Sequence, residues 1–243
     1  MFTVYTQMPP PHAAERERDM IKVILWDVDG TLLNFLQAEK CAIRACFSRF
    51  GLGECTDEML ADYSEINRRY WKMLERGEMT KPQILEGRFR EFFGNYGLDT
   101  SCVADFNREY QLRLGDTVVF NDDAFALLRR LAGRVKQYAV TNGTRIAQER
   151  KLRASELDTL LDGIFISEVV GAEKPSPVFF DAVFAAIGPC EKDEVLIVGD
   201  SLTSDMRGGN NAGVRCCWYN PEAQPGDISV RIDHEIRDLR EVE

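Results

Sequence analysis

The chain has 243 residues, of which 44% are hydrophobic and 29% charged, a composition that favours a soluble protein with one large α/β domain or a core plus a smaller domain. Its formal net charge of −10 argues against nucleic-acid backbones and anionic membranes as partners. No apolar run approaches transmembrane length, and seven scattered cysteines without a Cys-x-x-Cys pair predict reduced thiols in a cytoplasmic protein.

Residues 1–19 lack the apolar stretch of a signal peptide and are predicted to be a disordered extension. Met20 stands directly before the first predicted strand, so it is a candidate for the true start of the protein. The upstream residues would then be a start-codon artefact, an idea that a native N-terminus mapped to Met1 would refute.

A short acidic motif follows the first predicted strand. Residues 21–26 form an apolar run typical of a buried strand, and Asp27-Val28-Asp29-Gly30-Thr31 comes next. Two carboxylates two residues apart point the same way if strand geometry persists, and ligand sites in open parallel sheets lie at the carboxyl ends of strands. The motif therefore suits a divalent cation and an anionic substrate, with one carboxylate attacking and the other moving protons. The alternative is an ordinary Asp-x-Asp-Gly turn.

The segment after this motif shows apolar side chains at helical spacing. The stripes run from Leu36 to Phe50, from Met59 to Leu74, from Leu85 to Tyr96 and over residues 101–114. They predict the core of a helical bundle. A crossover between parallel strands needs only a dozen or more residues, whereas more than 100 separate Asp29 from Thr141. We therefore interpret residues 35–115 as an inserted helical domain, and residues 20–34 and 116–243 as one discontinuous core.

From residue 121 onward, apolar strands alternate with helices in the manner of βαβ units. Asn121-Asp122-Asp123 is predicted to cap a helix that ends before Gly133, and Ser176-Pro177 to begin a helix that stops at Gly188. Strands are predicted at residues 136–140, 164–166, 195–198, 216–219 and 230–232, the last two as outer strands. The alternation predicts an α/β fold with a parallel sheet.

Three later segments place polar groups at strand ends or in loops, each with a plainer alternative. Thr141-Asn142-Gly143-Thr144 offers a hydroxyl, an amide and backbone N–H groups for phosphate oxygens, or else is a simple Asn-Gly turn. Lys174 is presented from a loop stiffened by Pro175, or else is a solvated surface lysine. Asp200 and Asp205 offer oxygen ligands to a hard cation, or else cap the next helix.

Taken in this order, the four segments resemble the signature motifs of the haloacid dehalogenase-like hydrolase superfamily, over essentially residues 20–243. The resemblance implies a Rossmann-like, doubly wound parallel sheet with an α-helical cap inserted after the first strand. It also implies that Asp27 is the nucleophile that forms an aspartyl-phosphate, and that Asp29 is the general acid and then the general base.

The resemblance further assigns the groups that handle negative charge. Thr141 and Asn142 would hold the phosphoryl oxygens, and Lys174 would offset the phosphate and the crowded carboxylates. Mg²⁺ would be bound by the Asp27 carboxylate, the Asp29 backbone carbonyl and Asp200, with Asp205 as a ligand or just outside. Four acidic groups alone would repel a phosphate, so Mg²⁺ and Lys174 are needed to reverse the local field.

Other stretches resemble a bacterial subgroup of this family that contains noncanonical pyrimidine 5′-nucleotidases. They are residues 67–71, 75–80, 88–89, 148–152, 166–171, 205–213 and 217–221. The resemblance implies hydrolysis of nucleoside 5′-monophosphates, with Asn67 and Arg88 as candidate substrate contacts; structural polar contacts are the alternative for both. Trp26 replaces the usual Phe before the nucleophile and is expected to be tolerated as a buried aromatic.

We thus interpret the chain as a Mg²⁺-dependent phosphomonoester hydrolase for a small phosphorylated metabolite, a nucleotide, acting as a monomer or weak homo-oligomer. The same fold would serve a phosphatase for a sugar phosphate or phosphoglycolate, or a phosphomutase. Asp29 argues against a dehalogenase, because that reaction needs no proton donor for an alkoxide. A non-catalytic binding protein is the alternative from another class, although the acids, Thr141 and Lys174 are all present.

Overall fold

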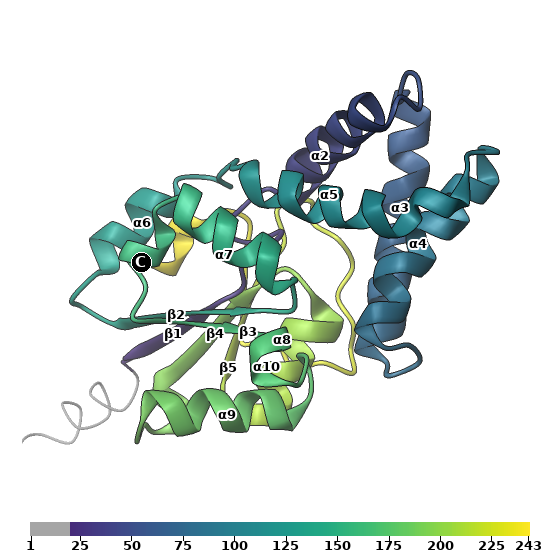
Figure 1. The fold of residues 1–243 in the computed structure, drawn as a ribbon. Coiled ribbons are helices and arrows are strands. Elements are labelled where there is room, and N and C mark those ends of the chain that lie inside the picture. Colours follow the sequence, from purple (N-terminus) through teal and green to yellow (C-terminus); the bar gives the residue numbers. More distant parts are fainter. Residues whose placement is uncertain (1–19) are drawn as a thin grey trace, which may run out of the picture.

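The computed structural model describes residues 20–243, so the predictions about residues 1–19 lie outside the described part. Within it, six parallel strands form one sheet in the order β3-β2-β1-β4-β5-β6 (Figure 1). The strands are β1 (Val23–Trp26), β2 (Lys136–Thr141), β3 (Gly163–Ile166), β4 (Val195–Gly199), β5 (Arg215–Tyr219) and β6 (His234–Ile236). This is the predicted Rossmann-like parallel sheet.

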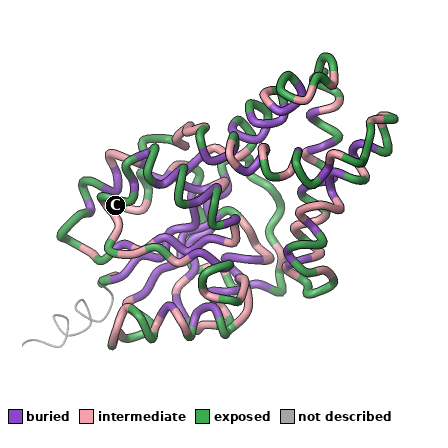
Figure 2. Tube along the Cα trace, viewed as in Figure 1, coloured by how far each residue is buried: buried purple, intermediate pink, exposed green. Residues whose placement is uncertain are grey.

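Helices cover both faces of the sheet. Because successive side chains of a strand point to opposite faces, Ile24 and Trp26 join one hydrophobic cluster, and Val23 and Leu25 join another. The first cluster includes α6 (Ala124–Leu131) and α7 (Arg145–Ala154), and the second includes α9 (Pro177–Ile187) (Figure 1). A strand buried on both faces must be apolar throughout, as β1 and β4 are (Figure 2).

The register of the strands brings their carboxyl ends to one edge of the sheet. Trp26 lies opposite Ala139 on β2 and opposite Val198 on β4. The residues that follow these three positions therefore emerge side by side. They include Asp27 and Thr141, together with the loop that begins after Gly199.

Four helices between β1 and β2 form a group of their own, which stands beyond the sheet in Figure 1. They are α2 (Phe35–Phe50), α3 (Asp57–Glu75), α4 (Lys81–Asn95) and α5 (Val103–Asp116), and together they are called the helical group below. Their predicted apolar stripes meet in a separate hydrophobic cluster rich in aromatic rings, in which Phe89 packs against Tyr63, Phe106 and Tyr110. The helical spacing in the sequence therefore reflects packing within this group.

Trp26 is buried and its indole N–H is satisfied. The ring nitrogen donates to Gln137 Oε1 at 3.2 Å, and the Gln137 amide donates in turn to the Leu128 carbonyl at 2.9 Å. A buried tryptophan needs such a partner, so the replacement of Phe by Trp at this position is accommodated by a polar side chain on β2.

The predicted strand at residues 230–232 is wrong, because the outer strand β6 begins at His234. Val230 and Ile232 do pack against the sheet, which explains the alternating pattern. The intervening Arg231 pairs its backbone with a side chain instead of a strand. Its N–H donates to Asn210 Oδ1 at 2.7 Å, and its carbonyl accepts from Asn210 Nδ2 at 2.9 Å.

The helix predicted after Asn121-Asp122-Asp123 is confirmed, with Asp123 at the cap position, but the side chains of this stretch make other contacts. Helix α6 begins at Ala124, but its cap Asp123 accepts no side-chain hydrogen bond there. Asn121 donates to the carbonyls of Gly30 and Thr31, at 3.0 and 2.9 Å. Asp122 accepts from the Tyr219 hydroxyl at 3.0 Å. These side chains therefore tie the start of α6 to the loop after β1 and to β5.

The seven cysteines all lie in the described residues and all are free thiols, as predicted. Among residues 20–243, no helix has both the length and the apolar character needed to cross a membrane.

Candidate active site

Lys174 lies at the centre of the polar groups at the strand ends. Its side chain is only 1% exposed, so the alternative of a solvated surface lysine is wrong. The ammonium donates to Asp27 Oδ1 at 2.8 Å, to Asp205 Oδ1 at 2.6 Å and to the Val140 carbonyl at 2.7 Å. Burial opposes the charged form, but Asp205 and Asp27 outweigh it and raise the pKa of Lys174.

Asn142 holds the loop that carries Lys174. Its Oδ1 accepts from the Lys174 backbone N–H at 2.8 Å, and its Nδ2 donates to the Lys174 carbonyl at 2.8 Å. The side chain predicted to bind phosphate is thus engaged in positioning the lysine. Thr141 is buried beside it, and its hydroxyl accepts from the Gly143 N–H at 3.1 Å.

Asp27 has one anchored oxygen and one free oxygen. Oδ1 accepts from Lys174, whereas Oδ2 is buried and has no hydrogen-bond partner among the described residues. Burial raises the pKa of Asp27 to about 7, with Asp205 and Asp29 adding to the rise and Lys174 opposing it. A buried, unpartnered carboxylate oxygen is costly, so this atom is where a ligand or a reacting group would be expected.

Three carboxylates converge at this point. Asp27, Asp200 and Asp205 each present an oxygen, and these oxygens lie within 4.8 Å of one another. Gly30 makes the approach possible: its φ is +94°, and a Cβ there would lie 2.5 Å from Asp200 Oδ2. With Lys174 they form what is called the strand-end cluster below. Clustered carboxylate oxygens are the donor set of hard divalent cations, so these residues fit a Mg²⁺ ion.

Asp205 has both oxygens engaged within this cluster. Oδ1 accepts from Lys174 and Oδ2 accepts from the Ser201 N–H at 3.1 Å. The residue lies in a π-helical turn, η4 (Leu202–Met206), so the alternative of a simple helix cap is only partly realised. Its position supports the two possibilities expected from the sequence, a ligand or a group just outside the ligands.

Asp29 is held by two side chains that the sequence did not single out. Lys151 forms an ion pair with Asp29 Oδ1, and Gln148 Nε2 donates to Asp29 Oδ2 at 2.6 Å. Both donors lie on α7 and are buried. The signal was available: a Gln and a Lys three residues apart share one face of a helix, and here that face meets the core.

Asn67 and Arg88, the candidate substrate contacts, lie inside the helical group. Arg88 donates to Asn67 Oδ1 at 2.6 Å and to Asn107 Oδ1 at 3.3 Å, and Asn67 donates to Glu39 Oε2 at 2.7 Å. Arg88 is 1% exposed and its guanidinium lies 5.0 Å from the centroid of the Phe89 ring. These four polar residues are called the Arg88 network below. Within the described residues, their hydrogen bonds and ring contacts are all with residues of the helical group or with Gln111, which lies on the same group.

The Arg88 network continues toward the sheet through one further residue. Gln111 Nε2 donates to Asn107 Oδ1 at 3.3 Å, and Gln111 Oε1 accepts from the Thr144 hydroxyl at 2.7 Å. Thr144 caps α7, directly after the Thr141-Asn142-Gly143 turn. A hydrogen-bonded path of buried and half-buried groups therefore links the helical group to the strand ends.

Two more contacts join the helical group to loops of the site. Glu75, at the end of α3, accepts from the Thr203 hydroxyl in η4. Lys81, at the start of α4, donates to the Ser167 hydroxyl and lies 3.4 Å from Glu173, the neighbour of Lys174. The helical group thus touches the loops that carry Asp205 and Lys174.

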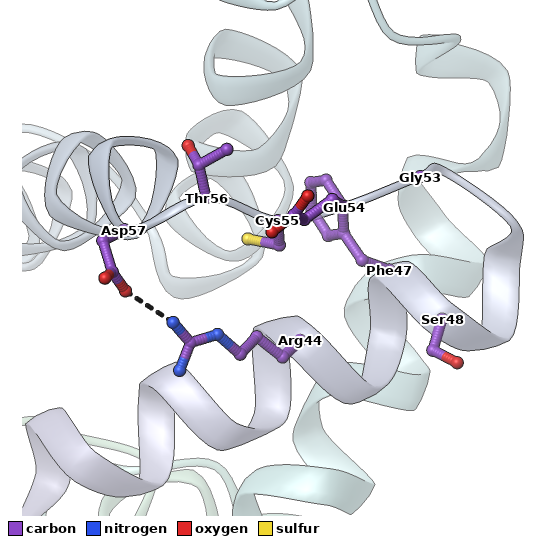
Figure 3. Close-up of a pocket in the computed structure, with 8 residues that line it drawn as sticks. All are labelled: Arg44, Phe47, Ser48, Gly53, Glu54, Cys55, Thr56 and Asp57. Atoms are coloured by element: carbon purple, nitrogen blue, oxygen red, sulfur yellow. Dashed lines mark hydrogen bonds and ion pairs between the residues drawn. The ribbon is translucent and has the colours of Figure 1, made fainter.

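A hollow elsewhere in the helical group lies between the end of α2 and the start of α3 (Figure 3). Residues 44, 47, 48 and 53–57 line it. Across it, the exposed side chains of Arg44 and Asp57 form an ion pair, with 2.5 Å between Nη2 and Oδ1. Its lining shares no residue with the strand-end cluster, so this hollow is not part of the candidate active site.

Comparisons with known proteins find a matching family and similar proteins. The model of the haloacid dehalogenase-like hydrolase family matches residues 24–219. The HAD-hydrolase YfnB of Bacillus subtilis is 35% identical, with 91% of this chain and 93% of that protein covered. Its crystal structure, bound to magnesium, matches with a TM-score of 0.86 over 92% of this chain and 97% of that one.

Two further relatives are both named as pyrimidine 5′-nucleotidases. The pyrimidine 5′-nucleotidase PynA of Streptococcus pneumoniae is 32% identical, with 88% of this chain and 90% of that protein covered. The pyrimidine 5′-nucleotidase YjjG of Escherichia coli is 28% identical, with 89% and 96% covered.

Proposed function

The chain belongs to the haloacid dehalogenase-like hydrolase family, and we propose that it is a Mg²⁺-dependent phosphomonoester hydrolase acting on nucleoside 5′-monophosphates. One observation carries the reaction type: Asp27 has a free, buried oxygen while Lys174 anchors the other. The two relatives named as pyrimidine 5′-nucleotidases support the substrate class.

In the first step, Asp27 is the nucleophile. Its free Oδ2 attacks phosphorus, the bond between phosphorus and the leaving oxygen breaks, and the protonated form of Asp29 gives its proton to that oxygen. The Lys174 contact fixes Oδ1, so the carboxylate can rotate little and presents Oδ2 to the substrate.

In the second step, water hydrolyses the aspartyl-phosphate. Asp29 takes a proton from the water as its oxygen attacks phosphorus, and the electron pair of the breaking bond returns to Asp27. The products are inorganic phosphate, an ionised Asp27 and a protonated Asp29. Asp29 is then ready to protonate the next leaving group.

The phosphoryl oxygens would be held at the turn after β2 and by Lys174. The Thr141 hydroxyl and the Lys174 ammonium are the side-chain donors in this proposal. Because the Asn142 amide is engaged with the Lys174 backbone, we expect Asn142 to contact phosphate through its backbone N–H instead.

The Asp27 and Asp200 carboxylates and the Asp29 backbone carbonyl would hold Mg²⁺, with Asp205 as a ligand or just outside. The ion, when bound, supplies positive charge that offsets the crowded carboxylates and the phosphate. The acidic cluster and the magnesium-bound structure of YfnB support this assignment.

Residues 35–115 would act as a cap over the core formed by residues 20–34 and 116–243, with Asn67 and Arg88 near the nucleoside. The separate hydrophobic cluster of the helical group supports the division. Free cysteines fit a reducing, cytoplasmic setting, and a monomer or weak homo-oligomer is expected.

A panel of phosphate esters, assayed for phosphate release with Mg²⁺ and with EDTA, tests the proposal. Nucleoside 5′-monophosphates should be the preferred substrates, and EDTA should abolish release. Turnover of sugar phosphates with no activity on any nucleotide would overturn the substrate class, and full activity of Asp27→Asn would overturn the mechanism.

A further inference from the structure

We propose that Lys151 and Gln148 are positioning residues that orient Asp29, so that after it has given its proton to the leaving group it can take the proton of the attacking water in the second step. The inference rests on the proposed function and adds a part that the family motifs at residues 27–31, 141–144, 174 and 200–205 do not contain.

The burial of Lys151 is the first observation. Its side chain is 1% exposed, although it stands on a helix whose neighbouring Arg153 reaches solvent. Burying an ammonium is costly unless a charge partner compensates it, and Asp29 Oδ1 supplies that partner. Hydrophobic packing alone would favour an apolar side chain at this position. The lysine is therefore explained by its contact with Asp29.

Gln148 completes the arrangement from the other side of the carboxylate. It is fully buried and donates through Nε2 to Asp29 Oδ2 at 2.6 Å. The space for it depends on Gly143, since a Cβ at that residue would lie 2.0 Å from Gln148 Nε2. Its own Oε1 has no partner among the described residues, so the amide is oriented toward Asp29 at a cost.

Together the two donors fix the orientation of Asp29. Each side-chain oxygen accepts a hydrogen bond from an N–H group, so the carboxyl group cannot turn freely. The Asp29 side chain is still 20% exposed, so solvent water can reach it. Once Asp29 has given its proton to the leaving group, this arrangement suits it to take a proton from the attacking water.

The inference predicts a specific kinetic signature in Lys151→Met. With p-nitrophenyl phosphate, whose good leaving group needs no protonation, formation of the aspartyl-phosphate should proceed as in the wild type. Its hydrolysis should slow by about 100-fold, the lower range for loss of general-base catalysis. Both kcat and KM should then fall in parallel, so that kcat/KM stays within about threefold of the wild-type value. Phosphoenzyme should accumulate in acid-quenched samples, where intact-mass spectrometry detects it.

Controls separate this outcome from a loss of structure. Lys151→Arg keeps the charge and the N–H donors and should restore most of kcat. Arg153→Met removes an exposed positive charge from the same helix and should leave the kinetics unchanged. Gln148→Ala should shift kcat and KM in the same direction by a smaller factor, and it serves as the second variant if Lys151→Met does not fold.

The inference is overturned if kcat and kcat/KM fall together in the folded variants and no phosphoenzyme accumulates. Failure of the proposed function would look different: the wild-type enzyme itself would form no phosphoenzyme, or Asp27→Asn would keep its activity.

Discussion

The strand-end cluster and the Arg88 network both bury charged side chains, but their charges balance differently. In the cluster, three aspartates surround one lysine, and Asp27 Oδ2 has no partner among the described residues. In the network, Glu39 and Arg88 carry one charge each, and Asn67 joins them by hydrogen bonds at both ends. One site has an excess of negative charge and the other is neutral.

This difference separates a site that needs a ligand from one that satisfies itself. A balanced network can stabilise the packing of helices without any further group, whereas crowded carboxylates remain strained until positive charge arrives. The free energy of unfolding should therefore rise strongly when a ligand binds the strand-end cluster, and it should change little when one of the cluster's aspartates is neutralised. For the Arg88 network, ligands should have little effect on the free energy of unfolding, and removal of a charged residue should lower it strongly.

The largest expected effect is on activity. Asp27→Asn should lower kcat/KM for nucleoside 5′-monophosphates by more than about 1,000-fold, because the nucleophile is lost. Its free energy of unfolding in EDTA should hold or rise, because one of the crowded carboxylates is neutralised. Phosphate release and urea unfolding measure the two quantities. A large loss of stability would show that Asp27 stabilises the unliganded cluster and is not one of several carboxylates that repel one another.

The next effect should appear only in stability. Arg88→Met leaves Glu39 buried without its cation and should lower the free energy of unfolding by about 3–5 kcal/mol. Adding Glu39→Gln in the same chain should recover part of that loss. Arg90→Met, which removes an exposed cation 3.2 Å from Glu86, is the matched control and should cost at most about 1 kcal/mol. Equal losses in Arg88→Met and Arg90→Met would show that the network stabilises nothing.

The Glu39→Gln, Arg88→Met double variant also tests the predicted substrate contact. If Arg88 touches the nucleoside, KM should rise in this variant although the protein is folded. An unchanged KM would leave Arg88 with a structural role only.

Stabilisation of the protein by Mg²⁺ should depend on the strand-end cluster and not on the Arg88 network. Mg²⁺ at about 100 times its Kd should raise the free energy of unfolding by about 2.7 kcal/mol. Asp200→Asn should remove most of this gain, and the Arg88 double variant should keep it. Urea unfolding with Mg²⁺ and with EDTA checks both, and an undiminished gain in Asp200→Asn would place the ion elsewhere.

The smallest effect concerns Glu75, which joins the helical group to η4, the turn that carries Asp205, through Thr203. Burial raises the pKa of Glu75 from 4.5 to about 7, with the Thr203 hydrogen bond opposing the rise and Asp205 adding to it. The folded protein therefore binds this proton more tightly than the unfolded chain does. This contribution to stability is full below about pH 4.5 and is lost as the pH rises through about 7.

Glu75→Gln should accordingly lose less stability than the wild type between about pH 5 and pH 8. Glu78→Gln, at an exposed position in the following turn, is the control and should follow the wild-type profile. Parallel profiles for Glu75→Gln and the wild type would mean that Glu75 is not buried against η4 in solution.

Much of the core could be predicted because its signals are local. The apolar β1 and β4 and the polar residues directly after each strand define the sheet and its active edge from short stretches. The failures involve partners distant in sequence. Nothing near residues 230–232 reveals that Asn210 pairs with the Arg231 backbone, which keeps this segment out of the sheet.

The same limit applies within the site. The sequence predicts that Asn142 is polar at a strand end, but not that its amide holds a loop 32 residues away. Polar residues on a helix are usually solvated, so the sequence alone does not indicate that Lys151 and Gln148 are buried; their burial depends on the packing of α7 over Asp29. Short motifs thus locate the reacting groups, whereas the residues that hold them depend on packing.

In the proposed reaction, Asp27 of the strand-end cluster takes up the phosphoryl group. The most direct test is to mix the enzyme with Mg²⁺ and a nucleoside 5′-monophosphate, quench in acid during turnover, and map the phosphorylated peptide by mass spectrometry. We expect a phosphoryl group on Asp27 and none in Asp27→Asn. A phosphoryl group on another residue would contradict this expectation. So would the absence of any phosphoryl group during turnover, once the phosphoenzyme is shown to survive the acid quench.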